Sequence, residues 1–98
     1  MNVRFAPRAL ADLEGIRDYL VPLSPRGAEH VRAEIAAAVD RIVEFPRTGN
    51  MTDEAGLYRY ALRKYRYTIF YRVIAGQDVV EVARIIHGAR VVNLRQLP

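Results

Sequence analysis

The chain has 98 residues, of which 51% are hydrophobic and 27% are charged, and its formal net charge at pH 7 is +4. This length supports one modest hydrophobic core, so we expect a single folded domain spanning residues 1–98 and exclude a disordered chain. The chain has no cysteine and only two histidines. Disulfides and thiolate chemistry are therefore excluded, and we expect no metal site and no cofactor.

The N-terminal segment and the apolar runs give an expectation about location. Asp12, Glu14 and Asp18 interrupt any apolar core of a signal peptide. No apolar run in the sequence approaches the length of a membrane span. We therefore expect a cytoplasmic protein.

The charge is distributed unevenly along the chain. Residues 1–56 contain seven arginines and nine acidic residues, whereas residues 57–98 contain eight basic and two acidic residues. The C-terminal part is thus the strongly basic one. This asymmetry predicts an electropositive surface for an acidic protein segment or for a nucleic acid.

The first part of the chain has the pattern of a strand followed by a helix. We expect a strand at residues 2–5 and a helix that starts at Arg8 and is stopped by Pro22, since proline lacks the backbone N–H that a helix requires. The apolar residues of this helix recur at three- and four-residue steps and form one stripe. They are Ala9, Leu13, Ile16 and Leu20.

A second amphipathic helix is expected from Ser24 to Phe45. Ser24 is a suitable N-cap, Pro25 fits the first helical position, and Pro46 ends the helix. Because only about three residues join the two helices, they must lie antiparallel as a helical hairpin. A stripe of this kind is most often core, and here it is expected to cover a sheet. Residues 47–56 are expected to form a loop.

Three strands are expected near residues 57–62, 65–74 and 78–87, with a hairpin turn at residues 75–77 in which Gly76 is free to take a positive φ. The last strand is apolar on both faces, so we expect it to lie inside the sheet. The helical hairpin covers one face, and the other face needs the chain's tail or a partner. The predicted fold class is therefore α+β: an N-terminal strand, then an antiparallel helical hairpin packed on one face of an antiparallel β-sheet (β-α-α-β-β-β).

Four motifs follow one another along the chain. They are Phe5-x-Pro7-x-Ala9-x-x-Asp12-Leu13-x-x-Ile16-x-x-Tyr19-Leu20, then Phe45-Pro46-x-x-Gly49, then Lys64-Tyr65-x-Tyr67-x-Ile69-Phe70-Tyr71-Arg72-Val73, and finally Ile85-x-His87-x-Ala89-Arg90. In this order and spacing they resemble the RelE/ParE superfamily of toxins from type II toxin–antitoxin systems. The resemblance covers nearly the whole chain and implies the fold that the residue pattern predicts.

The resemblance leads to two branches with different targets. RelE-like members are ribosome-dependent ribonucleases that cut mRNA, whereas ParE-like members act on DNA gyrase. In both branches a small antitoxin holds the toxin inactive, and its C-terminal segment folds as it binds. The implied partner is a ParD-like antitoxin with an acidic C-terminal segment. The candidate residues for binding the antitoxin or the target are Arg59, Arg63, Tyr71, Arg84 and Arg90.

The nuclease branch requires an acid or base and cations around the reacting phosphate. His87 is the candidate acid or base. The candidate cations are Arg63, Lys64, Arg84 and Arg90. Ribonucleolytic relatives usually place an aromatic or another catalytic side chain just after the last strand, and residues 88–98 contain neither an aromatic nor an acidic residue.

The ending His87-Gly88-Ala89-Arg90 is more similar to the ParE branch. The sequence therefore favours a toxin that inhibits DNA gyrase by binding and is not an enzyme. Two alternatives remain: a RelE-like ribosome-dependent mRNA endoribonuclease, and a toxin-fold binding module without activity.

Overall fold

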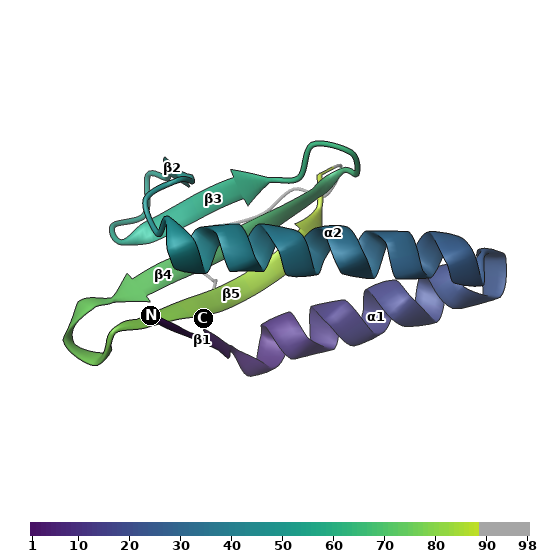
Figure 1. Cartoon of the computed structure of the whole chain (residues 1–98), viewed down its shortest axis with the longest axis horizontal. Helices are drawn as coiled ribbons and strands as arrows, with labels where there is room; N and C mark the ends of the chain where they lie inside the picture. Colours follow the sequence, from purple (N-terminus) through teal and green to yellow (C-terminus); the bar gives the residue numbers. More distant parts are fainter. Residues whose placement is uncertain (89–98) are drawn as a thin grey trace.

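The structure is a computed structural model, and it describes residues 1–88. Its helices and strands follow the order that the residue pattern predicts, with one additional short strand (Figure 1). They are β1 (Asn2–Phe5), α1 (Pro7–Leu23), α2 (Pro25–Glu44), β2 (Asn50–Met51), β3 (Leu57–Ala61), β4 (Tyr67–Ile74), the 3-10 turn η1 (Ala75–Gln77) and β5 (Val79–His87). The predicted α+β class is confirmed.

The five strands form one sheet in the order β1-β5-β4-β3-β2. The last strand is internal, as expected, because β1 and β4 flank β5. The sheet is mixed and not purely antiparallel, since β1 runs parallel to β5 with Asn2 opposite Val79 and Phe5 opposite Val82. All the other strand pairs are antiparallel. The apolar pattern of a short strand does not specify its neighbour or its direction, so the parallel pair could not be foreseen.

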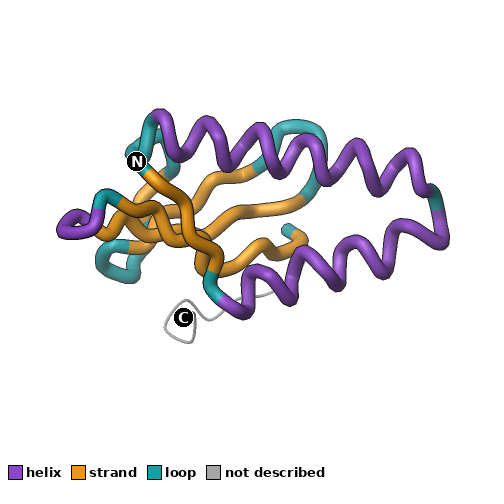
Figure 2. Tube along the Cα trace, turned by 60° about the horizontal axis from the view of Figure 1, so that its bottom comes forward, coloured by secondary structure: helices purple, strands orange, loops and turns teal. Residues whose placement is uncertain are grey.

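The helical hairpin covers one face of the sheet (Figure 1, Figure 2). The larger cluster of buried side chains lies between the two layers, and each large apolar side chain contributes about 1.5–3 kcal/mol on full burial. The helices provide Ala9, Val31, Ile35, Ala38, Val39 and Ile42, and the strands and the loop after β3 provide Leu62, Ile69, Tyr71, Val80, Val82 and Ile85. The stripe of the second helix is thus core, as predicted.

The connection between the helices is shorter than expected. Pro22 does not stop α1, because it lies within the last turn and the helix continues to Leu23. A single residue, Ser24, ends α1 and also caps α2: its hydroxyl oxygen accepts a hydrogen bond from the Gly27 N–H at 2.9 Å. The predicted cap and start of the second helix are therefore confirmed.

The closed end of the hairpin projects beyond the sheet (Figure 1, Figure 2). Apolar and aromatic side chains near this end consequently face solvent: Tyr19 is 70% exposed and Leu23 is 68% exposed. Within residues 1–88, neither helix is long and apolar enough to cross a membrane. In the part of the chain that the structure describes, Tyr19 and Leu23 mark an exposed apolar surface.

A β-bulge changes the alternation of β5. Phe70 pairs with Arg84 and Tyr71 pairs with Val82, so Ala83 is the extra residue. Before the bulge Val80 and Val82 join the larger cluster, and after it Ile85 does. The second cluster, on the other face of the sheet, contains Leu57, Phe70, Ala83 and Ile86. The expectation that both faces of the last strand are apolar is confirmed, whereas the expected cover by the tail lies outside the described residues.

Two local predictions were wrong. The turn before β5 has its positive φ at Asp78 (54°), and Gly76 has no such φ. Asp78 follows η1 and takes the left-handed conformation. Among residues other than glycine, aspartate and asparagine adopt this conformation most readily. The expected loop at residues 47–56 contains the two-residue strand β2, which pairs with Arg59 and Tyr58 of β3.

Candidate functional site

A basic cleft of about 450 Å³ lies beside the edge of the sheet, next to the last turn of α2. Two of the predicted binding residues, Arg59 and Arg63, line it together with Arg41, which the sequence analysis missed. The remaining lining residues are Thr48, Gly49, Asn50, Tyr60 and Ala61. Within residues 1–88, none of the three arginines forms an ion pair with a carboxylate. The cleft therefore carries three positive charges available to an anionic group.

Tyr71 was a candidate for binding a partner, but the structure places it in the core with 0% of its surface exposed. Its hydroxyl donates a hydrogen bond to the Pro46 carbonyl oxygen at 2.7 Å and accepts one from the Gly49 N–H at 3.0 Å. Its ring stacks on Tyr58, with the ring centroids 5.3 Å apart. Tyr71 thus ties the loop after α2 to the sheet and positions a wall of the basic cleft.

Burial raises the pKa of Tyr71 above its ordinary value of about 10, and burial does the same for Tyr67. The folded state therefore favours the protonated phenols. Their contribution to stability is fully present below about pH 10 and is lost as the pH rises through the folded-state pKa values.

We expect the free energy of unfolding to fall above about pH 10. In a Tyr71→Phe variant this decrease should be smaller, because one of the two phenols with a raised pKa is absent. Urea denaturation followed by circular dichroism between pH 8 and pH 11 measures the effect. An equally steep decrease in the variant would contradict the assignment to Tyr71.

Arg84 is engaged within the fold. Its Nε and Nη2 atoms donate to the two carboxylate oxygens of Asp12 at 2.8 and 3.0 Å, and one of those oxygens also accepts from the Ile85 N–H at 2.8 Å. The hydrogen bond to Asp12 raises the pKa of Arg84, so its guanidinium stays charged. β1 ends at Phe5, opposite Val82. Beyond that point the edge of β5 is bonded to α1, because Asp12 accepts the hydrogen bond from the Ile85 N–H. Arg84 is thus part of the scaffold.

His87 lies on a different surface, the Tyr–His pocket. Its edge-on partner is Tyr67, with the ring centroids 5.3 Å apart and an interplanar angle of 86°. The pocket has a volume of about 580 Å³. It is lined by Ala11, Asp12, Gly15, Ile16, Tyr19, Tyr67, Ile85, Ile86 and His87. It shares no lining residue with the basic cleft.

Two candidates remain, of which the structure describes Lys64; it is not among the residues that line the Tyr–His pocket. Lys64 is exposed in the loop between β3 and β4, and Arg90 lies outside the described residues. No group of three or more histidine, aspartate or glutamate side chains in residues 1–88 has a metal-ligand arrangement. Among the described residues, the structure therefore gathers Arg59 and Arg63 in the basic cleft, places His87 in the Tyr–His pocket and engages Arg84 with Asp12.

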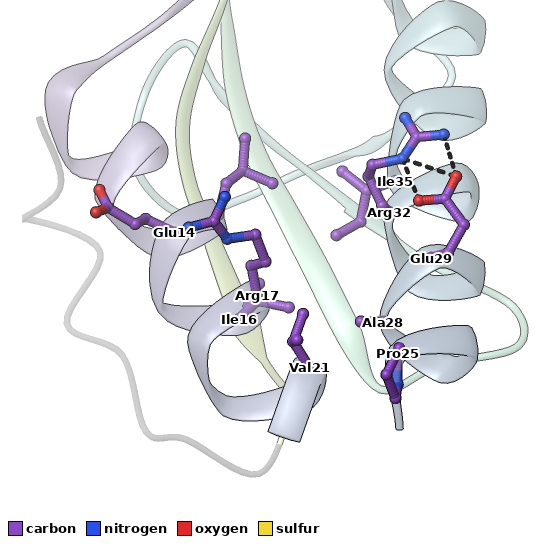
Figure 3. A pocket seen from close by; sticks show the side chains of 10 residues that line it. Glu14, Ile16, Arg17, Val21, Pro25, Ala28, Glu29, Arg32 and Ile35 are labelled. Atoms are coloured by element: carbon purple, nitrogen blue, oxygen red, sulfur yellow. Dashed lines mark hydrogen bonds and ion pairs between the residues drawn. The ribbon is translucent and has the colours of Figure 1, made fainter. Parts of the chain in front are cut away.

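A third surface is the interhelical groove, with a volume of about 560 Å³. Its apolar lining is formed by Leu13, Ile16, Val21, Pro25, Ala28 and Ile35, and its charged residues are Glu14, Arg17, Glu29 and Arg32. Figure 3 shows these side chains arranged between α1 and α2, with Glu29 and Arg32 paired to each other. The groove is thus an apolar channel with charged borders.

Residues 3–92 match the family described as the ParE toxin of the type II toxin–antitoxin system parDE. The chain belongs to the ParE toxin family. A curated relative, Toxin RelE2 of Caulobacter vibrioides, is 36% identical over 83 residues, which are 85% of this chain and 90% of the relative. This ParE-family chain is therefore a type II toxin of the RelE/ParE superfamily.

Solved structures of the superfamily share the fold of this ParE-family toxin. A chain of the chromosomal ParDE system from P. aeruginosa superposes with a TM-score of 0.76 at 23% identity, covering 89% of this chain and 95% of that one. A chain of the intact E. coli RelBE toxin–antitoxin complex superposes with a TM-score of 0.62 at 22% identity, covering 91% and 98%. Both branches thus use this architecture, and the target must be argued from the site.

Proposed function

We propose that this ParE-family toxin acts in the cytoplasm by binding DNA gyrase and inhibiting it, and that a cognate antitoxin neutralises it. The observation that carries the proposal is that three of the candidate nuclease residues, all within the described part of the chain, have different surroundings. His87 lines the Tyr–His pocket, Arg63 lines the basic cleft, and Arg84 is held by Asp12. The match to the ParE family points the same way.

RNA cleavage requires its acid, base and cations around a single phosphate, each within hydrogen-bond reach of the reacting atoms. β4 separates β5, which carries His87, from β3, next to Arg63. Since neighbouring strands lie about 4.8 Å apart, the backbones of β5 and β3 are about 10 Å apart. Arg84 would have to break a two-pronged ion pair to reach a phosphate. This arrangement favours inhibition by binding over cleavage.

The antitoxin is proposed to bind through apolar anchors. The interhelical groove offers an apolar channel between α1 and α2, and Tyr19 and Leu23 are exposed beside the projecting end of the hairpin. An amphipathic segment that places side chains in this groove would bury them against Ile16 and Ile35. Buried anchors of this kind provide most of the affinity at protein interfaces, and exposed charge pairs at the rim add little.

We expect excess purified toxin to abolish plasmid supercoiling by gyrase. Adding the cognate antitoxin should restore supercoiling. Agarose gels of plasmid topoisomers measure both effects, and toxin unfolded by heat is the control. Unchanged supercoiling at toxin excess would contradict the proposal.

The second candidate function is that of a RelE-like endoribonuclease, and it is supported by His87 as a candidate acid or base. In this alternative, translating ribosomes present the mRNA. Toeprinting of a translated mRNA tests it with wild-type toxin and with His87→Ala. Cleavage that requires both ribosomes and His87, together with unaffected supercoiling, would replace gyrase by the ribosome as the target. A chain that affects neither process would be a binding module without toxin activity.

A further inference from the structure

We propose that the Tyr–His pocket binds the indole ring of a tryptophan on the surface of a partner protein. The pocket lies between the middle of α1, the first residue of β4 and the last residues of β5. The proposed inhibition of gyrase assigns no role to this pocket. The pocket is also distinct from the interhelical groove, since among residues 1–88 Ile16 alone lines both.

Gly15 opens the pocket on the side of α1. It lies in the middle of the helix, where glycine is less favourable than alanine. Its φ is not positive, and a Cβ at this position would meet no atom within 4 Å. Neither the backbone conformation nor the packing of the described residues therefore requires glycine here. A ring that binds directly against the backbone of the helix would account for it.

Aromatic rings from three elements line the pocket: Tyr19 of α1, Tyr67 of β4 and His87 of β5. Tyr67 and His87 are paired across the two strands, and their rings meet edge to face. Ile85 and Ile86 add aliphatic surface to the lining. Aromatic rings pack favourably on one another in stacked or edge-on arrangements. At about 580 Å³ the pocket has room for the largest aromatic side chain, which is that of tryptophan.

The charges of the lining favour an uncharged ring with an N–H group. Within residues 1–88, no arginine or lysine lines the pocket, so a phosphate or a carboxylate has no such cation to bind. Asp12 is the acidic lining residue, and Arg84 balances its charge. Its Oδ1 atom accepts one hydrogen bond from Arg84, and a carboxylate oxygen can accept a second. The indole N–H is a donor without acceptor capacity and suits this atom.

The rim of the pocket favours a side chain over a free small molecule or a nucleotide. Tyr19 is 70% exposed, and His87 is exposed as well. Sites for small molecules usually enclose most of the ligand, whereas a ring in this pocket has an open outer edge. An open edge is where the backbone of a partner can rest. Tryptophan side chains that fill such pockets are common hot spots of protein interfaces.

The walls of the pocket are fixed before a ligand binds. The Gly88 N–H donates a hydrogen bond to the Arg66 carbonyl oxygen, which ties the end of β5 to the residue before β4. On the other side, Asp12 of α1 accepts from the Ile85 N–H at 2.8 Å. The helix and both strands are thus held together around the pocket. A preformed site lowers the entropic cost of binding.

The test uses the purified toxin and an uncharged heptapeptide with tryptophan at its centre and serine and glycine elsewhere. The toxin contains no tryptophan, so tryptophan fluorescence reports on the peptide alone. We expect the emission to shift to shorter wavelength on binding. Because a single ring offers few contacts, the dissociation constant should be roughly 1 mM. In NMR spectra the amide signals of Gly15 and Ile86 should shift, whereas that of Ala28 in the interhelical groove should not.

Three variants test the location. Gly15→Leu fills the pocket and should weaken binding by at least about tenfold. Its Cβ is unobstructed, so the variant should fold, which circular dichroism checks. Gly76→Leu is the matched control, since it adds the same side chain at an unobstructed glycine outside the pocket, and it should bind like wild type. Tyr19→Ser removes an exposed ring of the rim and should weaken binding about threefold.

Competition tests the chemistry of the ligand. A heptapeptide with leucine in place of tryptophan should not displace the tryptophan peptide, and neither should adenosine. No change in fluorescence at peptide concentrations of about 10 mM would overturn the proposal, as would equal binding by wild type and Gly15→Leu. Equal displacement by the leucine peptide or by adenosine would also overturn it. So would much tighter binding of free indole than of the peptide, which would assign the pocket to a small molecule.

Discussion

Replacing Asp12 with alanine is expected to lower the free energy of unfolding by about 2–4 kcal/mol, because the change leaves two donor groups without a hydrogen-bond acceptor. Arg84 loses both of its hydrogen bonds to the Asp12 carboxylate, and the Ile85 N–H loses its acceptor. The side chains of Arg84 and Asp12 are only 12% and 13% exposed, so water replaces these bonds poorly. Urea denaturation followed by circular dichroism gives the change in stability.

The matched variants separate the two lost interactions. Arg84→Met removes the ion pair but leaves the carboxylate of Asp12 on the Ile85 N–H, so it should cost less than Asp12→Ala. Asp18→Ala is the control for an exposed pair: Asp18 is 64% exposed and lies 3.7 Å from Arg17. It should change stability by less than about 0.5 kcal/mol. If Arg84→Met cost as much as Asp12→Ala, the bond to the edge of β5 would carry none of the effect.

The helical hairpin could be predicted because the sequence signals that specify it act between residues that are close in the chain. Apolar spacing and the Ser24-Pro25 cap each act within a few residues, and the structure has both the hairpin and the cap. The one wrong detail, Pro22, has a physical reason. Proline lacks a backbone N–H and disturbs the turn that precedes it, and α1 accommodates Pro22 only in its last turn and ends one residue later, at Leu23.

The sheet was predicted less completely because a bulge leaves no mark in the alternation of apolar residues. Reading β5 with a strict period of two puts Arg84 on the same face as Val82. The extra residue Ala83 shifts the register, and Arg84 then pairs with Asp12, which lies 72 residues earlier in the chain. A contact over that distance in sequence depends on the packing of α1 along β5. The electropositive character of the segment was predictable, but which arginines remain available was not.

The basic cleft likewise depends on contacts between residues that are distant in sequence. Arg59 and Arg63 are close in sequence and were predicted together, whereas Arg41 comes from the last turn of a helix. The packing of α2 on the sheet places Arg41 beside Arg59, and the buried Tyr71 hydroxyl holds the turn at Pro46 that follows α2. A tyrosine in a strand is usually a packing residue, and here it also positions a loop. The sequence did not indicate this role, because the close approach of Gly49 to Arg59 and Tyr71 is visible only in the structure.

Gly49→Ala is therefore expected to destabilise the toxin by about 2–4 kcal/mol, as overpacking and a lost hydrogen bond together predict. The added Cβ would lie 2.8 Å from the Arg59 carbonyl oxygen, which belongs to the backbone of β3 and cannot rotate away. The loop must shift instead, and the Gly49 N–H then leaves the Tyr71 hydroxyl. Thermal and urea denaturation measure the loss, and Gly76→Ala is the control because a Cβ at Gly76 meets nothing within 4 Å.

A double-mutant cycle with Tyr71→Phe tests whether the loop acts as one unit with the tyrosine. Phenylalanine removes the hydroxyl that a Cβ at position 49 would contact, and it also removes the hydrogen bond that the shifted loop would lose. The cost of Gly49→Ala should therefore be smaller in the Tyr71→Phe background than in wild type, with the clash against Arg59 remaining. Strictly additive costs would mean that Tyr71 does not hold the loop. The walls of the basic cleft would then be set by the pairing of β2 with β3 alone.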